Sequence, residues 1–187
     1  MGVCRLNSPK EPWEVYPKIW KSKAAFFTYL RGGLRQLWSC YPAKLNWKKS
    51  QMTTVPPIGY TGRGKSFGEC YYCRNMFNAS ALEVDHVSQA GTCNSWETAQ
   101  EFLHNLLDCN DNWVLACKPC HKVKSLAERN GSSFEEALVQ KQVIEFMKRP
   151  MKEIVAFCQE NGYTSSSLKN AKSRREAVTT IFNKEIE

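Results

Sequence analysis

The chain has no long apolar run. None of its hydrophobic stretches approaches the roughly 20 residues that a membrane-spanning helix needs. The short apolar run from Ala24 to Leu30 is flanked by lysine and arginine, so it is a poor secretory signal. The chain also has neither an internal repeat nor a low-complexity tract. These absences argue against a membrane protein, and we expect a soluble protein of the cytoplasm.

Acidic residues are scarce in the first third of the chain. Residues 1–65 hold 12 Lys/Arg and only 2 Asp/Glu, residues 66–130 hold 5 and 8, and residues 131–187 hold 9 and 8. The net charges are therefore +10, −3 and +1, which sum to the formal charge of +8. A basic segment beside an acidic one favours a polyanionic partner next to a cation site. The alternative is an ordinary basic, solvated surface.

The number of cysteines in the chain is not even. The chain has nine, and an odd count argues against a closed disulfide framework. Four of them form two C-x-x-C pairs, Cys70/Cys73 and Cys117/Cys120, and two such turns supply the four thiolates of a structural zinc. The alternatives are redox dithiols or buried free thiols. We interpret the other five as reduced and structural: Cys4, Cys40, Cys93, Cys109 and Cys158.

Histidine is rare, and all three histidines lie between or beside these pairs. In a strand–strand–helix unit, Asp85 at the end of a strand and His121 on the helix can hold one divalent ion that stabilises charge at a phosphate. His86 then lies on the other side of its strand and can act as general base. Lys124, one turn after His121, can bind a phosphate. The alternatives are a surface Asp–His pair and a His121 shared with the zinc. We interpret His104 as structural, and the alternative is that it lines the groove.

The same residues resemble a known family. Val84-Asp85-His86-Val87, then Asn112 through Cys117, then Cys120-His121-x-x-Lys124, look like the HNH endonuclease motif in its four-cysteine zinc form. Cys73 and Asp85 are 12 residues apart and Asn112 and Cys117 are 5 apart, as in that motif. Trp113 stands where an aliphatic residue is usual, and 25 residues separate His86 from Asn112. A weaker similarity links residues 26–42 to some phage-encoded HNH proteins.

The resemblance implies a ββα-metal core and a fold of the α+β class. It implies catalytic residues Asp85, His86, Asn112 and His121, with Asp85 and His121 binding Mg²⁺ or Mn²⁺ and the four cysteines binding Zn²⁺. Asn112 would hold the hairpin and orient the base through backbone hydrogen bonds. The implied reaction is DNA phosphodiester hydrolysis that leaves 5′-phosphate and 3′-hydroxyl ends, in a phage homing or nicking enzyme or a restriction or DNA-processing nuclease.

The sequence pattern predicts mostly helices outside this core. Helices are expected over residues 22–39, 96–107, 121–130, 134–148, 151–160 and 166–184, with strands at 82–87 and 112–115. Residues 45–64 are expected to be a linker, either ordered or a tether. We therefore divide the chain into a basic, aromatic N-terminal arm and linker (1–65), a nuclease core (66–131) and a C-terminal helical region (132–187).

Double-stranded DNA is the expected partner of a monomer or homodimer. Residues 151–171 fit a helix-turn-helix pattern with its turn at Gly162, although many helical hairpins look the same. The tryptophans of the arm either stack on bases or pack its helix onto the core. The rival functions are a zinc-stabilised binding module without catalysis and a toxin-like nuclease. The expected DNA contacts are Arg63, Lys65, Lys118, Lys122, Lys124, Lys169, Asn170 and Lys172.

Overall fold

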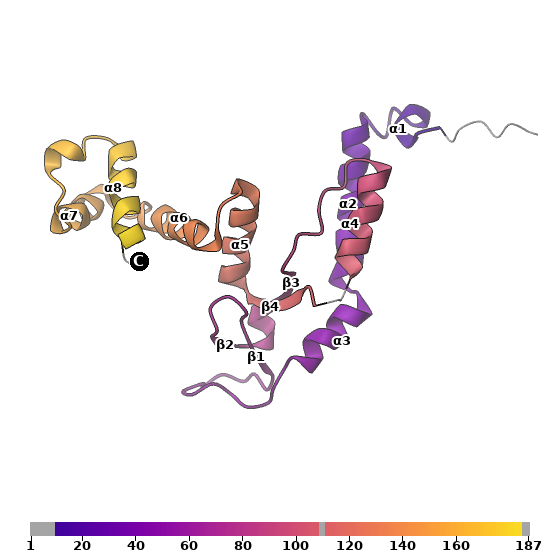
Figure 1. The fold of residues 1–187 in the computed structure, drawn as a ribbon, viewed down its shortest axis with the longest axis horizontal. Helices are drawn as coiled ribbons and strands as arrows, with labels where there is room; N and C mark the ends of the chain where they lie inside the picture. Colours follow the sequence, from indigo (N-terminus) through magenta and orange to yellow (C-terminus); the bar gives the residue numbers. More distant parts are fainter. Residues whose placement is uncertain (1–9, 109–110, 185–187) are drawn as a thin grey trace, which may run out of the picture. The chain divides into compact units, whose positions relative to one another are not determined.

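The protein is α+β, as expected. A computed structural model describes residues 10–108 and 111–184, and these contain eight α-helices and two two-stranded sheets (Figure 1). They form two compact units, residues 1–117 and 118–187. No helix in the described ranges is both long and apolar enough to span a membrane. Two of the cysteines interpreted as structural, Cys4 and Cys109, lie outside the described residues.

The first unit begins with three helices. They are α1 (Pro12–Val15), α2 (Lys23–Ser39) and α3 (Pro42–Ser50). Ser22 caps α2 as predicted, because its hydroxyl accepts a hydrogen bond from the Ala25 amide at 3.2 Å. The glycine pair within α2 neither breaks the helix nor packs closely, since a Cβ at Gly32 or Gly33 would meet nothing within 4 Å.

The prediction of a linker over residues 45–64 was wrong for residues 45–50. Helix α3 occupies residues 42–50, because Pro42 is well suited to the first turn of a helix. Lys48 then donates hydrogen bonds to the carbonyls of Ala79 and Leu82, at 2.9 and 2.6 Å. The rest of the segment is ordered, and Thr53 and Phe67 exchange two backbone hydrogen bonds of 2.8 Å. This arm is thus part of the first unit and not a tether.

Two short antiparallel sheets lie in the first unit. Strand β1 (Phe67–Glu69) pairs with β2 (Met76–Asn78), and after the 3₁₀ turn Ala79–Ala81, β3 (Leu82–His86) pairs with β4 (Trp113–Cys117). Two-stranded sheets are marginally stable alone, so they depend on packing and cross-links. Gly68 permits close packing, because a Cβ there would lie 2.8 Å from Leu115 and 3.0 Å from Leu82.

Helix α4 (Trp96–Leu107) packs against α2 within the first unit. Ser95 caps α4 through a capping box with Thr98. Phe27 of α2 and Phe102 and Leu106 of α4 are fully buried together, with Trp13, Phe26, Leu30, Leu34 and Trp38 packed around them. The aromatic residues of the arm therefore pack a helix onto the core, which was one of the two alternatives.

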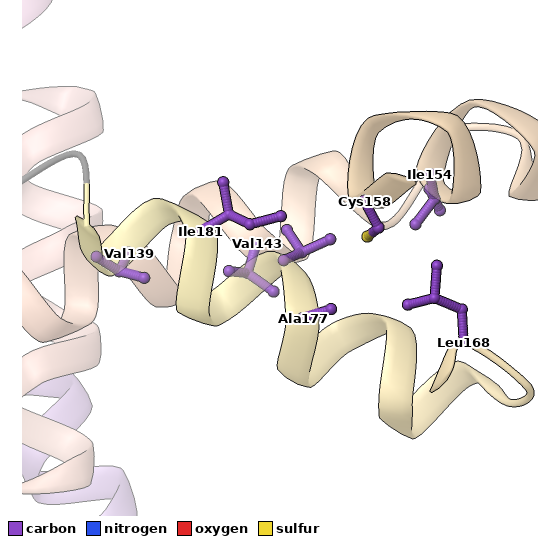
Figure 2. Packing of buried hydrophobic residues seen from close by; sticks show 8 residues of the cluster. Val139, Val143, Ile154, Cys158, Leu168, Ala177 and Ile181 are labelled. Carbon is purple, nitrogen blue, oxygen red and sulfur yellow. The ribbon is translucent and has the colours of Figure 1, made fainter. Parts of the chain in front are cut away.

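The second unit is helical. It contains α5 (Lys118–Asn130), α6 (Phe134–Phe146), α7 (Met151–Glu160), a 3₁₀ turn (Ser165–Ser167) and α8 (Ala171–Lys184). Gly131, at φ +65°, ends α5 as a left-handed cap. Figure 2 shows the core formed by α6, α7 and α8. Its buried members are Val139, Val143, Ile154, Cys158, Leu168, Ala177, Val178 and Ile181.

The expected helix-turn-helix has a longer connection than that motif uses. Helices of a helix-turn-helix are joined by about 3–4 residues, whereas residues 161–170 separate α7 from α8. Leu168 lies in this connection and is buried in the core. Asn170, an expected DNA contact, caps α8 instead, because its Oδ1 accepts from the Ser173 amide at 2.8 Å. The segment is a packed connection between two helices.

Replacing Leu168 by alanine should destabilise the second unit by about 2–5 kcal/mol, because it leaves a cavity among α6, α7 and α8. Urea denaturation followed by circular dichroism measures this. The matched control is Lys169→Ala at the exposed neighbouring position, which should change stability by less than about 0.5 kcal/mol. Equal stability of the two variants would show that the connection does not pack against the helices.

Candidate functional site

The four cysteines at zinc spacing come together. The Sγ atoms of Cys70, Cys73, Cys117 and Cys120 all lie within 4.8 Å of one another, and those of Cys73 and Cys117 are 4.0 Å apart. A tetrahedral zinc with sulfur ligands at 2.3 Å requires sulfur–sulfur distances of about 3.8 Å. Cys70 and Cys117 are buried, and all four are free thiols. This cluster could hold a structural metal such as zinc.

Cys70 is prepared for metal binding by its surroundings. Burial of its thiol opposes ionisation, but hydrogen bonds from the backbone of Cys117, Cys73 and Tyr72 and from the Cys73 side chain outweigh it. Together they lower the pKa of Cys70 to about 7. The amide of Cys117 lies 3.3 Å from the Cys70 sulfur. A thiolate is the form that binds a metal, so this thiol needs little help from the ion to lose its proton.

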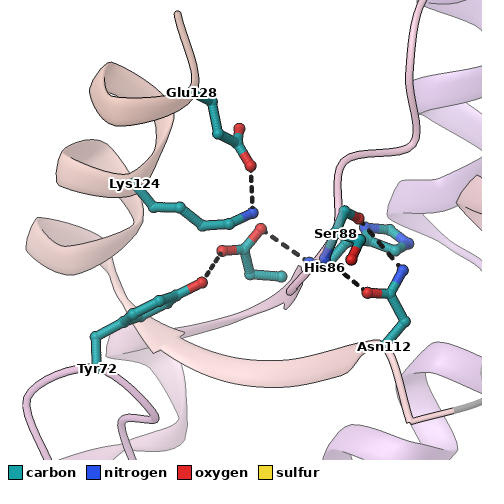
Figure 3. Close-up of polar contacts among 7 residues, drawn as sticks. Tyr72, His86, Ser88, Asn112, Lys124 and Glu128 are labelled. Atoms are coloured by element: carbon teal, nitrogen blue, oxygen red, sulfur yellow. Dashed lines mark hydrogen bonds and ion pairs between the residues drawn. The ribbon is translucent and has the colours of Figure 1, made fainter. Parts of the chain in front are cut away.

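Asp85 and His86 lie on opposite faces of the β3–β4 sheet. Asp85 is paired with Val114 and His86 with Trp113, and paired residues share a face while successive residues alternate. Asp85 is only 7% exposed. Its Oδ2 accepts from the hydroxyl of Tyr72 at 3.1 Å, and its Oδ1 accepts from the amide of His86 at 2.9 Å (Figure 3). The carboxylate is thereby held in one orientation.

His86 is enclosed by two helices of the first unit. It is 8% exposed, and its ring lies against Trp38 of α2 with the ring centroids 4.5 Å apart. Its Nε2 lies 3.0 Å from the carbonyl oxygen of Leu106 at the end of α4. A carbonyl can only accept, so Nε2 carries the hydrogen and Nδ1 is the basic nitrogen of the neutral ring. The imidazole is thus fixed in tautomer and in direction.

Asn112 joins the segments that leave β3 and enter β4. Its Oδ1 accepts from the Ser88 amide at 2.7 Å, and its Nδ2 donates to the Ser88 carbonyl at 3.3 Å (Figure 3). Its own carbonyl accepts from the Val87 amide at 2.8 Å. These three bonds extend the pairing of the sheet beyond its last residue. They fix the backbone directly after His86.

The remaining predicted residues lie in α5. His121 is half-buried in its first turn. Lys124, which is predicted to contact a phosphate, is buried, and its Nζ lies 2.6 Å from Glu128 Oε1 (Figure 3). A lysine that is already neutralised by a neighbouring carboxylate is poorly suited to bind DNA. Lys118 and Lys122, in contrast, are exposed on the same helix.

The other basic candidates are exposed. Arg63 and Lys65 lie just before β1, Lys169 lies before α8, and Lys172 lies in the first turn of α8, where it is 4.0 Å from Glu176. His104 is exposed on α4.

Three contacts of the site were not anticipated from the sequence. Tyr72 binds Asp85, Trp38 covers His86, and the Leu106 carbonyl fixes the His86 ring. Tyr72 lies within the first C-x-x-C pair, so its nearness to the site had a signal in the sequence. Trp38 and Leu106 had none, because their contacts depend on how α2 and α4 pack.

Comparisons with known proteins identify no relative of this chain. No protein-family model matches the chain, and no curated protein and no solved structure is detectably similar to it.

Proposed function

We propose that this protein is a metal-dependent DNA endonuclease with a structural zinc. The observation that carries the proposal is the end of β3, where a buried carboxylate and a buried imidazole follow one another and each is oriented by a hydrogen bond from or to another element. An Asp–His pair on a solvated surface needs no such support. The basic first third of the chain supports a nucleic acid as substrate.

Two kinds of metal fit the residues present. The four sulfurs suit zinc by number, type and spacing. Asp85 and His121 are the carboxylate and imidazole that would hold Mg²⁺ or Mn²⁺, and each oxygen of Asp85 can accept more than the one bond described above. When bound, such an ion stabilises negative charge on the phosphate and on the leaving oxygen.

The chain's own residues supply the general base and its alignment. His86 Nδ1 takes the proton of the attacking water, while Nε2–H stays bonded to the Leu106 carbonyl and keeps the ring in place. Asn112 holds the backbone that follows His86. Tyr72 keeps the Asp85 carboxylate directed by donating a hydrogen bond to it. The resemblance to HNH endonucleases favours 5′-phosphate and 3′-hydroxyl products and a homing or nicking role.

Cleavage of supercoiled plasmid in the presence of Mg²⁺ or Mn²⁺ tests this proposal. We expect nicked or linear DNA from the wild type, and loss of cleavage in Asp85→Ala, because the carboxylate that holds the ion is gone. Glu83→Ala, at a half-buried position on the same strand, is the matched control and should retain activity.

The second candidate is a zinc-stabilised DNA-binding module, favoured by the cysteine cluster alone. A folded, zinc-loaded wild type that binds DNA and leaves the plasmid intact under all conditions would establish this module and refute the nuclease.

A further inference from the structure

We infer that a pocket in the first unit binds a single unpaired nucleobase of the substrate, an inference that rests on the proposed function. The pocket has a volume of about 210 Å³ and lies where α3, β4 and the turn between β1 and β2 meet. Sites that enclose a whole drug-sized ligand begin at roughly 300 Å³, so this one suits one ring system. Its walls include Trp47, Gln51, Glu69, Tyr71, Arg74 and Trp113.

Aromatic rings form much of the pocket. Trp47 meets Trp113 edge to face, with ring centroids 5.9 Å apart. Tyr71 is 43% exposed although it is a large aromatic residue. A nucleobase presents a flat π-face that stacks on such rings whatever its identity, and base–aromatic stacking is a frequent mode of single-strand recognition.

Arg74 is held at a position that favours glycine. It is one of two described non-glycine residues with positive φ, at +58°, in the turn that follows Cys73. Its guanidinium lies over the Tyr71 ring at 5.0 Å from the centroid. Its ion pair with Glu69 spans 3.5 Å between largely exposed side chains, so it adds little stability. The turn itself is held by its backbone, because the Arg74 amide donates to the Cys70 carbonyl at 2.9 Å. Non-glycine residues held at such backbone angles cluster at ligand-binding sites.

The polar groups of the pocket favour a base over a phosphate. Glu69 lies beside Arg74 and offsets its charge, so an anion gains little there. Glu69 and Gln51 together offer acceptors and donors, which match the mixed edges of a nucleobase. The indole N–H of Trp113 is buried and has no acceptor among the described residues, so it is a polar atom that the surrounding structure leaves unsatisfied.

The location links this pocket to the proposed cleavage site. Trp113, one of its walls, is paired with His86 across the β3–β4 sheet, and both lie on the same face. A base held at Trp113 would therefore place its nucleotide close to the strand that carries the proposed general base. The pocket would select DNA that exposes an unpaired base near the scissile bond.

Fluorescence anisotropy with two DNA duplexes tests this inference. The duplexes are identical except that one carries a single extrahelical adenosine and the other an abasic nucleotide at that position, in buffer with Ca²⁺ in place of Mg²⁺. We expect the wild type to bind the adenosine duplex about 5- to 150-fold more tightly, the range that stacking of one base provides. Arg74→Gly and Tyr71→Leu should reduce this ratio toward one.

The variants are chosen so that a change in folding cannot be mistaken for a change in DNA binding. Glycine suits φ +58° better than arginine, so Arg74→Gly should not destabilise the turn. Arg175→Ala removes an equivalent charge from an exposed position on α8 and should keep the wild-type ratio. Equal binding of both duplexes by the wild type, or an unchanged ratio in both pocket variants, refutes the pocket while plasmid cleavage still stands. Absence of both DNA binding and cleavage refutes the pocket and the nuclease together.

Discussion

Replacing His86 by alanine should slow plasmid cleavage by about 10²- to 10⁴-fold, the range attributed to a general base. His86 is the imidazole whose tautomer the Leu106 carbonyl fixes, so its Nδ1 is the basic nitrogen at the site. DNA affinity should change little, because the ring is only 8% exposed and has little surface to offer DNA. Single-turnover cleavage and anisotropy, measured on the same preparation, separate the two effects.

The effect of the His86→Ala substitution on the stability of the protein needs a separate control. Alanine leaves the Leu106 carbonyl without its donor, which costs about 1–3 kcal/mol for a buried group. His86→Gln restores a donor but no base, so it should fold more stably than the alanine variant and be equally slow. His104→Ala removes an exposed histidine from α4 and should cleave normally. Wild-type rates in folded His86→Ala and His86→Gln would remove His86 from the mechanism.

Loss of zinc is expected to unfold the centre of the first unit. Structural zinc contributes apparent binding free energies of about 10–16 kcal/mol in zinc-finger peptides at pH 7, and here it would cross-link two sheets that are marginal alone. We expect elemental mass spectrometry to find one zinc ion per chain. Removal of the zinc by dialysis against 1,10-phenanthroline should abolish cooperative thermal unfolding. Circular dichroism and tryptophan fluorescence both monitor this transition.

Cysteine variants locate the metal. Cys70→Ser and Cys117→Ser should lose the zinc and the stability together, because serine keeps the size of the side chain but supplies no thiolate. Cys40→Ser is the matched control, since Cys40 is exposed at the end of α2 and is not one of the four clustered cysteines. A metal-free chain that melts like the zinc-loaded one would show that the cluster is a set of free thiols.

The local elements were the part of the fold that the sequence predicted best. The helix at Trp96–Leu107 and the helix at Met151–Glu160 were predicted with their bounds, because each has a helical apolar period and a clear cap or stop. The helix at 42–50 was missed, since most of its residues were assigned to the linker over 45–64. Residues 166–170 were assigned to a helix that begins at Ala171, because Leu168 kept the apolar period while lying in a loop.

The sequence by itself determined the cluster of four cysteines and the order of the strands around Asp85 and His86, because short-range spacing controls which cysteines share a turn and which side chains share a strand face. Only the tertiary structure decided that Trp38 and the Leu106 carbonyl enclose His86, that Lys124 is neutralised by Glu128, and that the arm packs onto the core. The first kind of information is local in the chain. The second depends on how helices distant in sequence pack against each other and against a sheet, and no periodicity in one segment records which distant residue will cover it.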